Sequence, residues 1–334
     1  MIIETHAYAR AGLCGNPSDG YYGKTISFSI RNFKTTVKLW ESPRLEILQT
    51  DADHRSYGSL GDLMRDLKLY GYYGGERLIK AAIRTLVNYA RKTGQPLHDR
   101  NFTIAYSSDV PRLVGLSGSS AIVVATMKAL MQFYNLTVPK PLLPTLVLSA
   151  EKDELKISAG LQDRVIQVYE GMVYMDFDKE HLTKHGYGIY EELRPNPMPP
   201  LYVSYDPKRA EISDITHRNL REAYDRGDET VHRAMQRYRE LTTEARSALL
   251  AGDWEKLAAC SNAGFDLRRT IMDIAPENLR MVETARKVGA SSAFAGSGGA
   301  VCGVYFSGPQ YQELCDEMAR IGCTTLRPLV FPLD

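Results

Sequence analysis

The stretch from Pro111 to Lys128 reads Pro-Arg-Leu-Val-Gly-Leu-Ser-Gly-Ser-Ser-Ala-Ile-Val-Val-Ala-Thr-Met-Lys and predicts a loop followed by a helix. Two glycines and three serines fall within residues 115–121, and apolar residues then follow at positions 122, 125, 129, 130 and 133. That spacing is typical of an amphipathic helix. The amides and the dipole at its start favour an anion such as phosphate, and serine hydroxyls there can ligate Mg²⁺.

The same loop has a plainer interpretation. A flexible turn followed by a helix that Ser119 or Ser120 caps would give the same sequence without any ligand. The loop alone leaves both interpretations open, because glycine-rich motifs also occur by chance.

Composition and charge narrow the class of protein. A chain of 334 residues is long for a single core, so we expect two domains. With 41 basic and 40 acidic residues the net charge is +1, which disfavours a nucleic-acid partner. No apolar run approaches a membrane span, and the start, Met-Ile-Ile-Glu-Thr-His, lacks the features of a signal peptide. The five scattered cysteines form no Cys-x-x-Cys pair, so we expect a cytoplasmic protein without disulfides, with its oligomeric state open.

The pattern along the chain predicts an α+β fold. Strands are expected at 25–30, 35–40, 102–106, 173–177, 201–205, 301–306 and near 324–331. Helices are expected at 62–69, 76–91, from the glycine-rich loop to about 134, from 142 to Glu151, at 161–169, over most of 211–288, and at 310–320. The segment 194–200 holds four prolines in seven residues, and we place the boundary there, between domains 1–195 and 200–334.

Two other glycine motifs do not fit the roles that they suggest. Gly23-Lys24-Thr25 matches the end of a P-loop, but Ser18 stands where the first glycine belongs and a strand is expected next. Gly296-Ser-Gly-Gly would need a glycine at Val301 to be a dinucleotide fingerprint. Its plain interpretation is a tight turn.

Two carboxylates, Glu151 and Asp163, stand beside the basic residues Lys152 and Arg164. The plain interpretation of each is a solvated charge on a helix. Asp163, however, follows the small residues of Ser158-Ala-Gly-Leu-Gln, which would allow a ligand to approach closely.

Three blocks together resemble the motifs of the GHMP small-molecule kinases. They are Gly15-Asn-Pro-Ser-Asp, Gly115-Leu-Ser-Gly-Ser-Ser-Ala and Phe294-Ala-Gly-Ser-Gly-Gly-Ala, in the family's order. Within that superfamily the chain is most similar to plant-type glucuronokinases. That similarity extends through Asn16-Pro-Ser-Asp-Gly-Tyr-Tyr-Gly-Lys-Thr-Ile-Ser-Phe, Gly71-Tyr-Tyr-Gly-Gly, Leu97-His-Asp-Arg-Asn-Phe-Thr, Leu148-Ser-Ala-Glu-Lys and Gly160-Leu-Gln-Asp-Arg-Val.

The resemblance implies a fold and an activity. The N-terminal domain would resemble ribosomal protein S5, and the C-terminal domain would be ferredoxin-like. The protein would be an ATP- and Mg²⁺-dependent sugar-1-kinase acting on D-glucuronate. The alternatives are another sugar (galacturonate, a neutral hexose or a heptose) and, in a different class, a non-catalytic sugar or nucleotide sensor.

The resemblance also assigns roles to residues. Asp163 would be the catalytic aspartate, and Arg10 would lie near the transferred phosphoryl group and keep Asp163 ionised. Ser120 and Glu151 would hold Mg²⁺, and Asp19 would bind sugar hydroxyls. ATP phosphates would be bound by Gly115, Leu116, Ser117, Gly118 (serine in many relatives), Ser119, Ser120 and Ala121. The loop Gly296, Ser297, Gly298 and Gly299 would close over the substrates.

A sugar acid also needs a cation to bind its carboxylate, ideally an arginine that makes two hydrogen bonds. The candidates in the sequence are Lys24, Arg164, Arg268 and Arg269. Each has a plain alternative as a surface charge, and the sequence does not choose among them.

Overall fold

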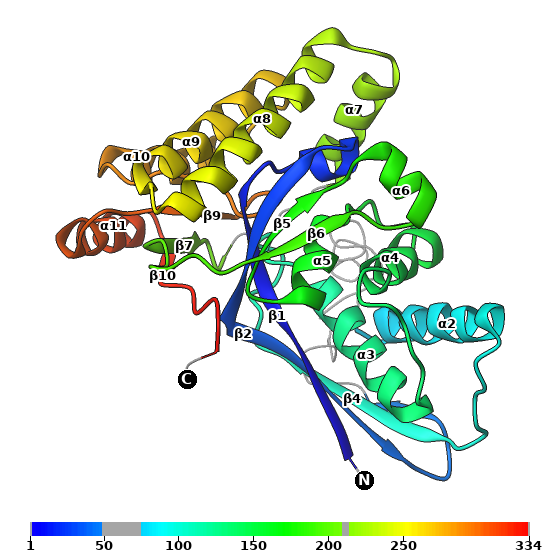
Figure 1. Ribbon diagram of the computed structural model, residues 1–334. Helices are drawn as coiled ribbons and strands as arrows, with labels where there is room; N and C mark the ends of the chain where they lie inside the picture. The colour runs from blue at the N-terminus through cyan, green and yellow to red at the C-terminus, as the bar shows by residue number, and fades with distance from the viewer. Residues whose placement is uncertain (1, 49–74, 209–213, 333–334) are drawn as a thin grey trace, which may run out of the picture.

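The computed structural model describes residues 2–48, 75–208 and 214–332. It contains two sheets with helices packed against them (Figure 1), which confirms the α+β class. The helix expected at 62–69 lies outside the described residues.

The first sheet has the strand order β3-β4-β2-β5-β6, with β1 paired to β2. Its strands are β1 (Ile2–Cys14), β2 (Lys24–Glu41), β3 (Glu46–Leu48), β4 (Phe102–Ser108), β5 (Met172–Asp176) and β6 (Ile189–Leu193). The helical segments of this half are η1 (Ser18–Tyr21), α2 (Gly75–Thr93), α3 (Gly118–Tyr134), α4 (Leu143–Ser149), η2 (Ala150–Glu154), α5 (Gln162–Tyr169) and α6 (Lys179–His185).

The strands expected at 25–30 and 35–40 form one continuous strand, β2. The register against β1 shifts between Tyr8 and Ala9, since Tyr8 pairs with Lys34 and Ala9 with Ile30. Such a bulge inserts extra residues without ending the pairing, which explains why the alternation breaks in the sequence although the strand does not.

Helix α3 is the centre of the first core. Its residues from Ser120 to Met127 are all buried, so the expectation of an amphipathic helix was wrong for this segment. The helix packs against β1 and β2 on one side and against α2, α4 and α5 on others, and a helix covered in this way is apolar nearly all round.

The second sheet has the order β10-β7-β9-β8. Its strands are β7 (Leu201–Tyr205), β8 (Ala293–Phe294), β9 (Ala300–Val304) and β10 (Thr324–Leu326). The helices of this half are α7 (Asp214–Asp225), α8 (Glu229–Ala251), α9 (Trp254–Ile271), α10 (Pro276–Lys287) and α11 (Gly308–Arg320). The strand–helix–strand–strand–helix–strand sequence with this order is the ferredoxin-like pattern expected for the second domain.

The two halves share a core. Ala9, Ile26 and Phe28 of the first sheet pack in one cluster with Leu257 of α9 and Cys302 of β9. The chain crosses from one sheet to the other between β6 and β7, where the proline-rich segment lies. The first sheet is therefore covered on one face by α2–α5 and at one end by the second half (Figure 1).

Candidate active site

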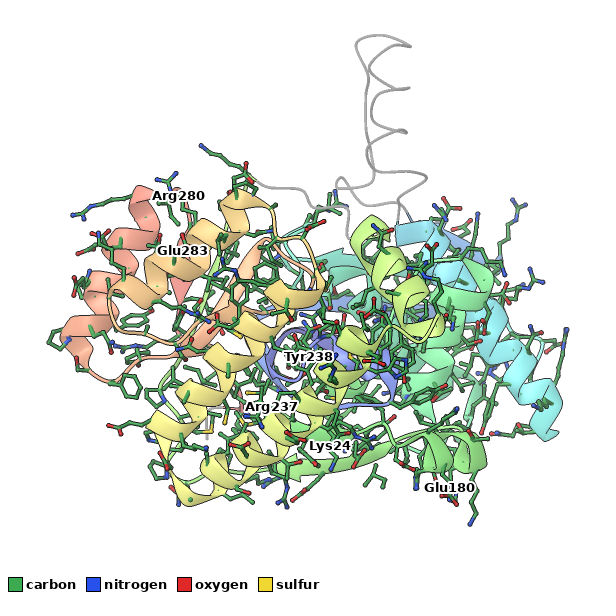
Figure 2. All side chains as sticks on the ribbon, turned by 90° about the horizontal axis from the view of Figure 1, so that it is seen from above. Lys24, Glu180, Arg237, Tyr238, Arg280 and Glu283 are labelled. Atoms are coloured by element: carbon green, nitrogen blue, oxygen red, sulfur yellow. The ribbon has the colours of Figure 1, made fainter. Side chains whose placement is uncertain are left out.

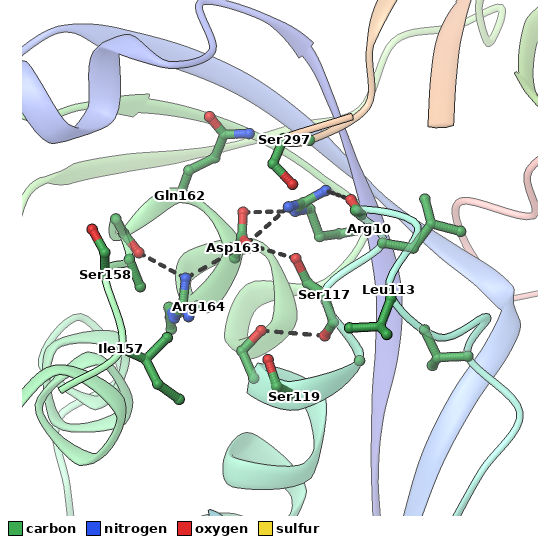
Figure 3. Close-up of a pocket in the computed structure, with 18 of the residues that line it drawn as sticks. Arg10, Leu113, Ser117, Ser119, Ile157, Ser158, Gln162, Asp163, Arg164 and Ser297 are labelled. Atoms are coloured by element: carbon green, nitrogen blue, oxygen red, sulfur yellow. Dashed lines mark hydrogen bonds and ion pairs between the residues drawn. The ribbon is translucent and has the colours of Figure 1, made fainter. Parts of the chain in front are cut away.

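A cavity of about 960 Å³ lies where the two halves meet. Its wall is formed by the glycine-rich loop before α3, the segment around the start of α5, η1 at the end of β1, and the loop after β8. Helix α7 contributes Arg221 from the second half. Figure 3 shows the charged and polar side chains that converge on this cavity.

Two residues of the loop before α3 adopt the left-handed backbone conformation. Gly115 and Ser117 have positive φ angles of 71° and 63°, and α3 begins at Gly118. The plainer alternative, a helix capped by Ser119 or Ser120, does not hold: Ser117 is the N-cap residue, and its hydroxyl makes no capping hydrogen bond. It donates instead to Oδ2 of Asp163 at 2.6 Å. The first amides of α3 therefore have no capping side chain, which suits an anion.

Asp163 and Arg10 form a two-pronged ion pair at the centre of the cavity (Figure 3). Nε of Arg10 lies 2.6 Å from Oδ1, and a terminal nitrogen donates to Oδ2 at 2.8 Å. Burial raises the pKa of Asp163, but the charges of Arg10 and Arg164 and the Ser117 hydroxyl outweigh it and hold that pKa well below its usual range. The expectation that Arg10 keeps Asp163 ionised is confirmed.

Arg10 also joins the two glycine-rich loops. Its other terminal nitrogen donates to the carbonyl oxygens of Gly115 at 2.7 Å and Ala295 at 2.8 Å. A Cβ atom at Gly296 would collide with the carbonyl oxygen of Gly115, so the loops touch through their backbones. Glycine is required here for close approach.

A second ion pair, Arg164 with Glu151, lies behind the first. Nε and a terminal nitrogen of Arg164 lie 2.7 and 2.5 Å from Oε2 of Glu151, and the other terminal nitrogen donates to the carbonyl of Gly160 at 2.9 Å. Glu151 is fully buried and is not part of the cavity wall. Burial raises the pKa of Glu151, although the charge of Arg164 opposes this.

The donor set around Glu151 fits a magnesium ion held jointly with phosphates. Oε1 of Glu151 is buried and accepts no hydrogen bond, and Ser120 lines the cavity with its hydroxyl donating to the carbonyl of Ser117 at 3.2 Å. Among the described residues no three His, Cys, Asp or Glu side chains lie close enough together to hold a metal by themselves. Mg²⁺ commonly takes one or two protein ligands and completes its shell with phosphate and water.

Asp19 of η1 faces the same cavity. Its Oδ2 accepts a hydrogen bond from the amide of Gln162 at 3.2 Å, and a side chain at Gly160 would overlap its carboxylate. Burial, together with the nearby charge of Asp163, raises the pKa of Asp19 to about 6. The group therefore changes its charge close to the physiological range.

The loop after β8 reaches the cavity only in part. Gly296 and Ser297 line the wall, whereas Gly298 and Gly299 do not. The amide of Gly299 instead donates to Oδ1 of Asn278 at 3.0 Å, so it is already engaged within the protein. Of the four residues expected at the substrate, Gly296 and Ser297 therefore line the cavity, and Gly299 is bound within the second half.

Three of the four candidate cations lie outside the cavity wall. Lys24 pairs with Asp176 at 3.2 Å and lies beside α8 (Figure 2). Arg268 is buried, stacks 4.8 Å over the ring of Phe294 and donates to the carbonyl of Gly296 at 3.2 Å. Arg269 is an exposed residue of α9. Of the four, Arg164 alone reaches the cavity, and Glu151 already holds it.

Arg221 was missed by the sequence reasoning. It stands in an ordinary polar helix, and its place beside η1 depends on how two segments 201 residues apart fold together. Its guanidinium lies 4.4 Å over the ring of Tyr21 and donates to the carbonyl of Gly20. No pattern in the sequence could have revealed this contact.

The GHMP kinase N-terminal domain model matches residues 77–171, which include the loop before α3, Glu151 and Asp163. This fold, with a glycine-rich loop and helix start facing the half-buried Asp163, is that of the GHMP kinases, and the chain belongs to that family. It is 43% identical to "Glucuronokinase 1" of Arabidopsis thaliana over 98% of this chain and 91% of that protein. It is also 43% identical to "Probable glucuronokinase 2" of the same plant, over 96% and 88%.

A solved structure supports the fold. Lactococcus lactis galactokinase, in complex with galactose, superposes with a TM-score of 0.75 at 17% identity, over 98% of this chain and 93% of that one. At that identity the likeness concerns the fold alone.

Proposed function

We propose that this protein is an ATP-dependent sugar-1-kinase that phosphorylates D-glucuronate at its anomeric hydroxyl. The observation that carries the proposal is the ionised Asp163, clamped by Arg10 and facing the uncapped start of α3. The names of the two Arabidopsis relatives support the substrate.

Asp163 would align the acceptor hydroxyl and take its proton. Because its pKa lies below the usual range, the carboxylate is ionised at neutral pH and can accept a hydrogen bond from that hydroxyl. A weak base suffices, since phosphoryl transfer depends mainly on alignment and on charge stabilisation. Ser117 and Arg10 fix the direction of the carboxylate before the substrate arrives.

ATP would bind with its phosphates at the loop 115–121. The amides at the start of α3 would donate hydrogen bonds to the phosphate oxygens. Arg10, which lies beside Asp163, would stabilise the negative charge on the transferred phosphoryl group. Mg²⁺, when bound, would neutralise phosphate charge. Ser120 and Glu151 would hold it, and Arg164 would then share Glu151 with the ion.

The sugar would bind on the η1 side of Asp163, with Asp19 accepting hydrogen bonds from its hydroxyls. Gly296 and Ser297 would close the cavity from the second half. Among the described helices none is long and apolar enough to cross a membrane. We further propose a cytoplasmic location, which the five free cysteines support.

An ADP-release assay with Mg²⁺-ATP tests this function. The panel contains glucuronate, galacturonate, glucose, galactose and a heptose. We expect turnover to be highest with glucuronate. Preference for another sugar would support the kinase activity but contradict glucuronate as the substrate. ATP binding without any ADP release across the panel would contradict the proposed kinase activity and favour a non-catalytic sensor.

A further inference from the structure

We propose that Arg221 of α7 binds the carboxylate of the sugar acid and so sets the preference for uronic acids. The inference rests on the proposed function and names a residue for the part of the substrate that distinguishes it from neutral sugars. Arg221 lines the cavity, and it comes from the opposite half of the molecule to Asp163.

The two arginines next to Asp163 are already neutralised. Arg10 gives its hydrogen bonds to both oxygens of Asp163 and to two carbonyl groups. Arg164 is bound to Glu151, lies 3.5 Å from Asp163, and is influenced by the charge of Asp19 as well. A substrate carboxylate placed beside Arg164 would join three carboxylates that share one guanidinium, which electrostatic repulsion disfavours.

Arg221 is in a different position, because its charge is poorly compensated. Its side chain is 44% exposed, whereas that of Arg164 is 6% exposed. It hydrogen-bonds the neutral carbonyl of Gly20, and its acidic neighbour Asp225 is 3.7 Å away and itself largely exposed. The guanidinium lies over the ring of Tyr21, and apart from the bond to Gly20 it has further N–H groups that can donate to a carboxylate, which a guanidinium can bind with two parallel hydrogen bonds.

The place of Arg221 also fits the shape of the substrate. In a uronic acid the carboxylate and the anomeric carbon lie on opposite sides of the ring oxygen. A sugar with its anomeric hydroxyl on Asp163 would direct its carboxylate away from that residue. Arg221 lies over Gly20 and Tyr21, the two residues after Asp19, which is the expected partner of the sugar hydroxyls.

The remaining cationic side chains that line the cavity lie near the proposed phosphate-binding loop and magnesium site. Arg112 precedes the loop of α3, Lys152 is next to Glu151 in η2, and Lys156 donates to the carbonyl of Asp153 just beyond η2. These segments flank the proposed phosphate and magnesium site. Among the cavity-lining cations of the described residues, Arg221 is therefore the one placed for the acid group.

The test compares D-glucuronate with D-glucuronamide, its neutral isostere, in the full-length enzyme with saturating Mg²⁺-ATP. The variant Arg221→Gln removes the positive charge. The variant Arg221→Lys keeps the charge but cannot make two parallel hydrogen bonds to a carboxylate. Arg226→Gln is the matched control, because Arg226 directly follows the same helix, pairs with the exposed Glu222 at 3.9 Å, and lies outside the cavity wall.

We expect Arg221→Gln to raise the KM for glucuronate by about 10- to 100-fold, the usual effect of losing hydrogen bonds to a charged group. The KM for glucuronamide and the KM for ATP should stay within about twofold, kcat should change little, and Arg221→Lys should be intermediate. Arg226→Gln should behave like the unchanged protein.

Two results would overturn the inference. An unchanged KM for glucuronate in Arg221→Gln would exclude the residue. An equal rise for glucuronate and glucuronamide would show that Arg221 only holds η1 in place. Absence of glucuronate turnover by the unchanged protein is a separate outcome, and it would contradict the proposed function itself.

Discussion

The two arginine–carboxylate pairs of the site lie side by side, because Asp163 of one pair directly precedes Arg164 of the other, yet their carboxylates differ. The Asp163 side chain is 22% exposed and lines the cavity, and its pKa is lowered. Glu151 is fully buried behind the wall, and its pKa is raised. Asp163 receives both prongs of Arg10 and a serine hydroxyl, whereas only one oxygen of Glu151 is bound.

The difference shows how one kind of pair serves two purposes. A carboxylate with both oxygens bound is fixed in direction and charge, as alignment of a hydroxyl demands. A carboxylate with one buried, unsatisfied oxygen is incomplete, because such an oxygen costs free energy until it finds a partner. We infer that Asp163 is preorganised for the sugar, whereas Glu151 remains available to a cation.

The largest effect is expected for Asp163→Asn. The amide cannot accept the proton, so kcat should fall by about 100- to 10,000-fold, the range of general base contributions. Circular dichroism and ATP binding should change little. Asp153→Asn is the control, since Asp153 is an exposed residue of η2 that bonds Ser149. Full activity of Asp163→Asn would contradict its role.

The next effect concerns the partner of that aspartate. Arg10→Lys keeps a positive charge but cannot bind both oxygens of Asp163 in the same way, so kcat should fall by about 10- to 100-fold. The pKa of Asp163 should rise, because fewer hydrogen bonds favour its ionised form. The acidic limb of the kcat profile should therefore move to higher pH. A profile that stays in place with kcat unchanged would show that the clamp is dispensable.

The second pair should respond through magnesium. In Glu151→Gln the Mg²⁺ concentration that gives the half-maximal rate should rise at least about tenfold, which is the lower end of the usual loss of metal affinity when a residue of a metal site is changed. The melting temperature should also fall, because Arg164 is left buried without its partner. Glu154→Gln is the matched control, as Glu154 pairs with Arg84 at the surface of the same segment. An unchanged Mg²⁺ requirement would remove Glu151 from the metal site.

The smallest effect is a pH dependence from Asp19. With its pKa raised to about 6, Asp19 is ionised above that pH and protonated below it. Protonation weakens it as an acceptor, so the KM for glucuronate should rise about fourfold at pH ~5.5 relative to pH ~7.5. The KM for ATP should not follow. In Asp19→Asn the KM for glucuronate should be raised at every pH but should not vary over this range, and a persisting rise toward low pH would place the titration elsewhere.

The residues of the proposed catalytic centre could be singled out from the sequence because they lie in short motifs. Gly115 to Ala121 and Asp163 each lie within a local pattern, and the resemblance supplied Arg10 as the partner of Asp163. The structure brings Arg10 and Asp163 together across 153 residues. The strands at 201–205 and 301–306 and the helix at 310–320 were also predicted, within a few residues, by local patterns.

What depends on tertiary packing could not be predicted. Lys24 and Arg164 look alike as charges in the sequence, but β2 places Lys24 beside α8, whereas α5 places Arg164 in the cavity wall. Glu151 was expected on the helix that starts near 142, and it lies on the direct continuation of α4, but the sequence did not reveal that this continuation is the π-helical segment η2. Arg221 carries no local signal at all, since its role follows from the contact of α7 with η1.

The proposed transfer of phosphate to the anomeric hydroxyl is tested most directly by determining the structure of the product. The unchanged protein would be incubated with glucuronate and Mg²⁺-ATP, and the product examined by phosphorus and proton NMR. We expect one phosphate on C1, shown by coupling of the anomeric proton to phosphorus, and no such product from Asp163→Asn. A phosphate on another carbon, or an equal yield from Asp163→Asn, would contradict this proposal.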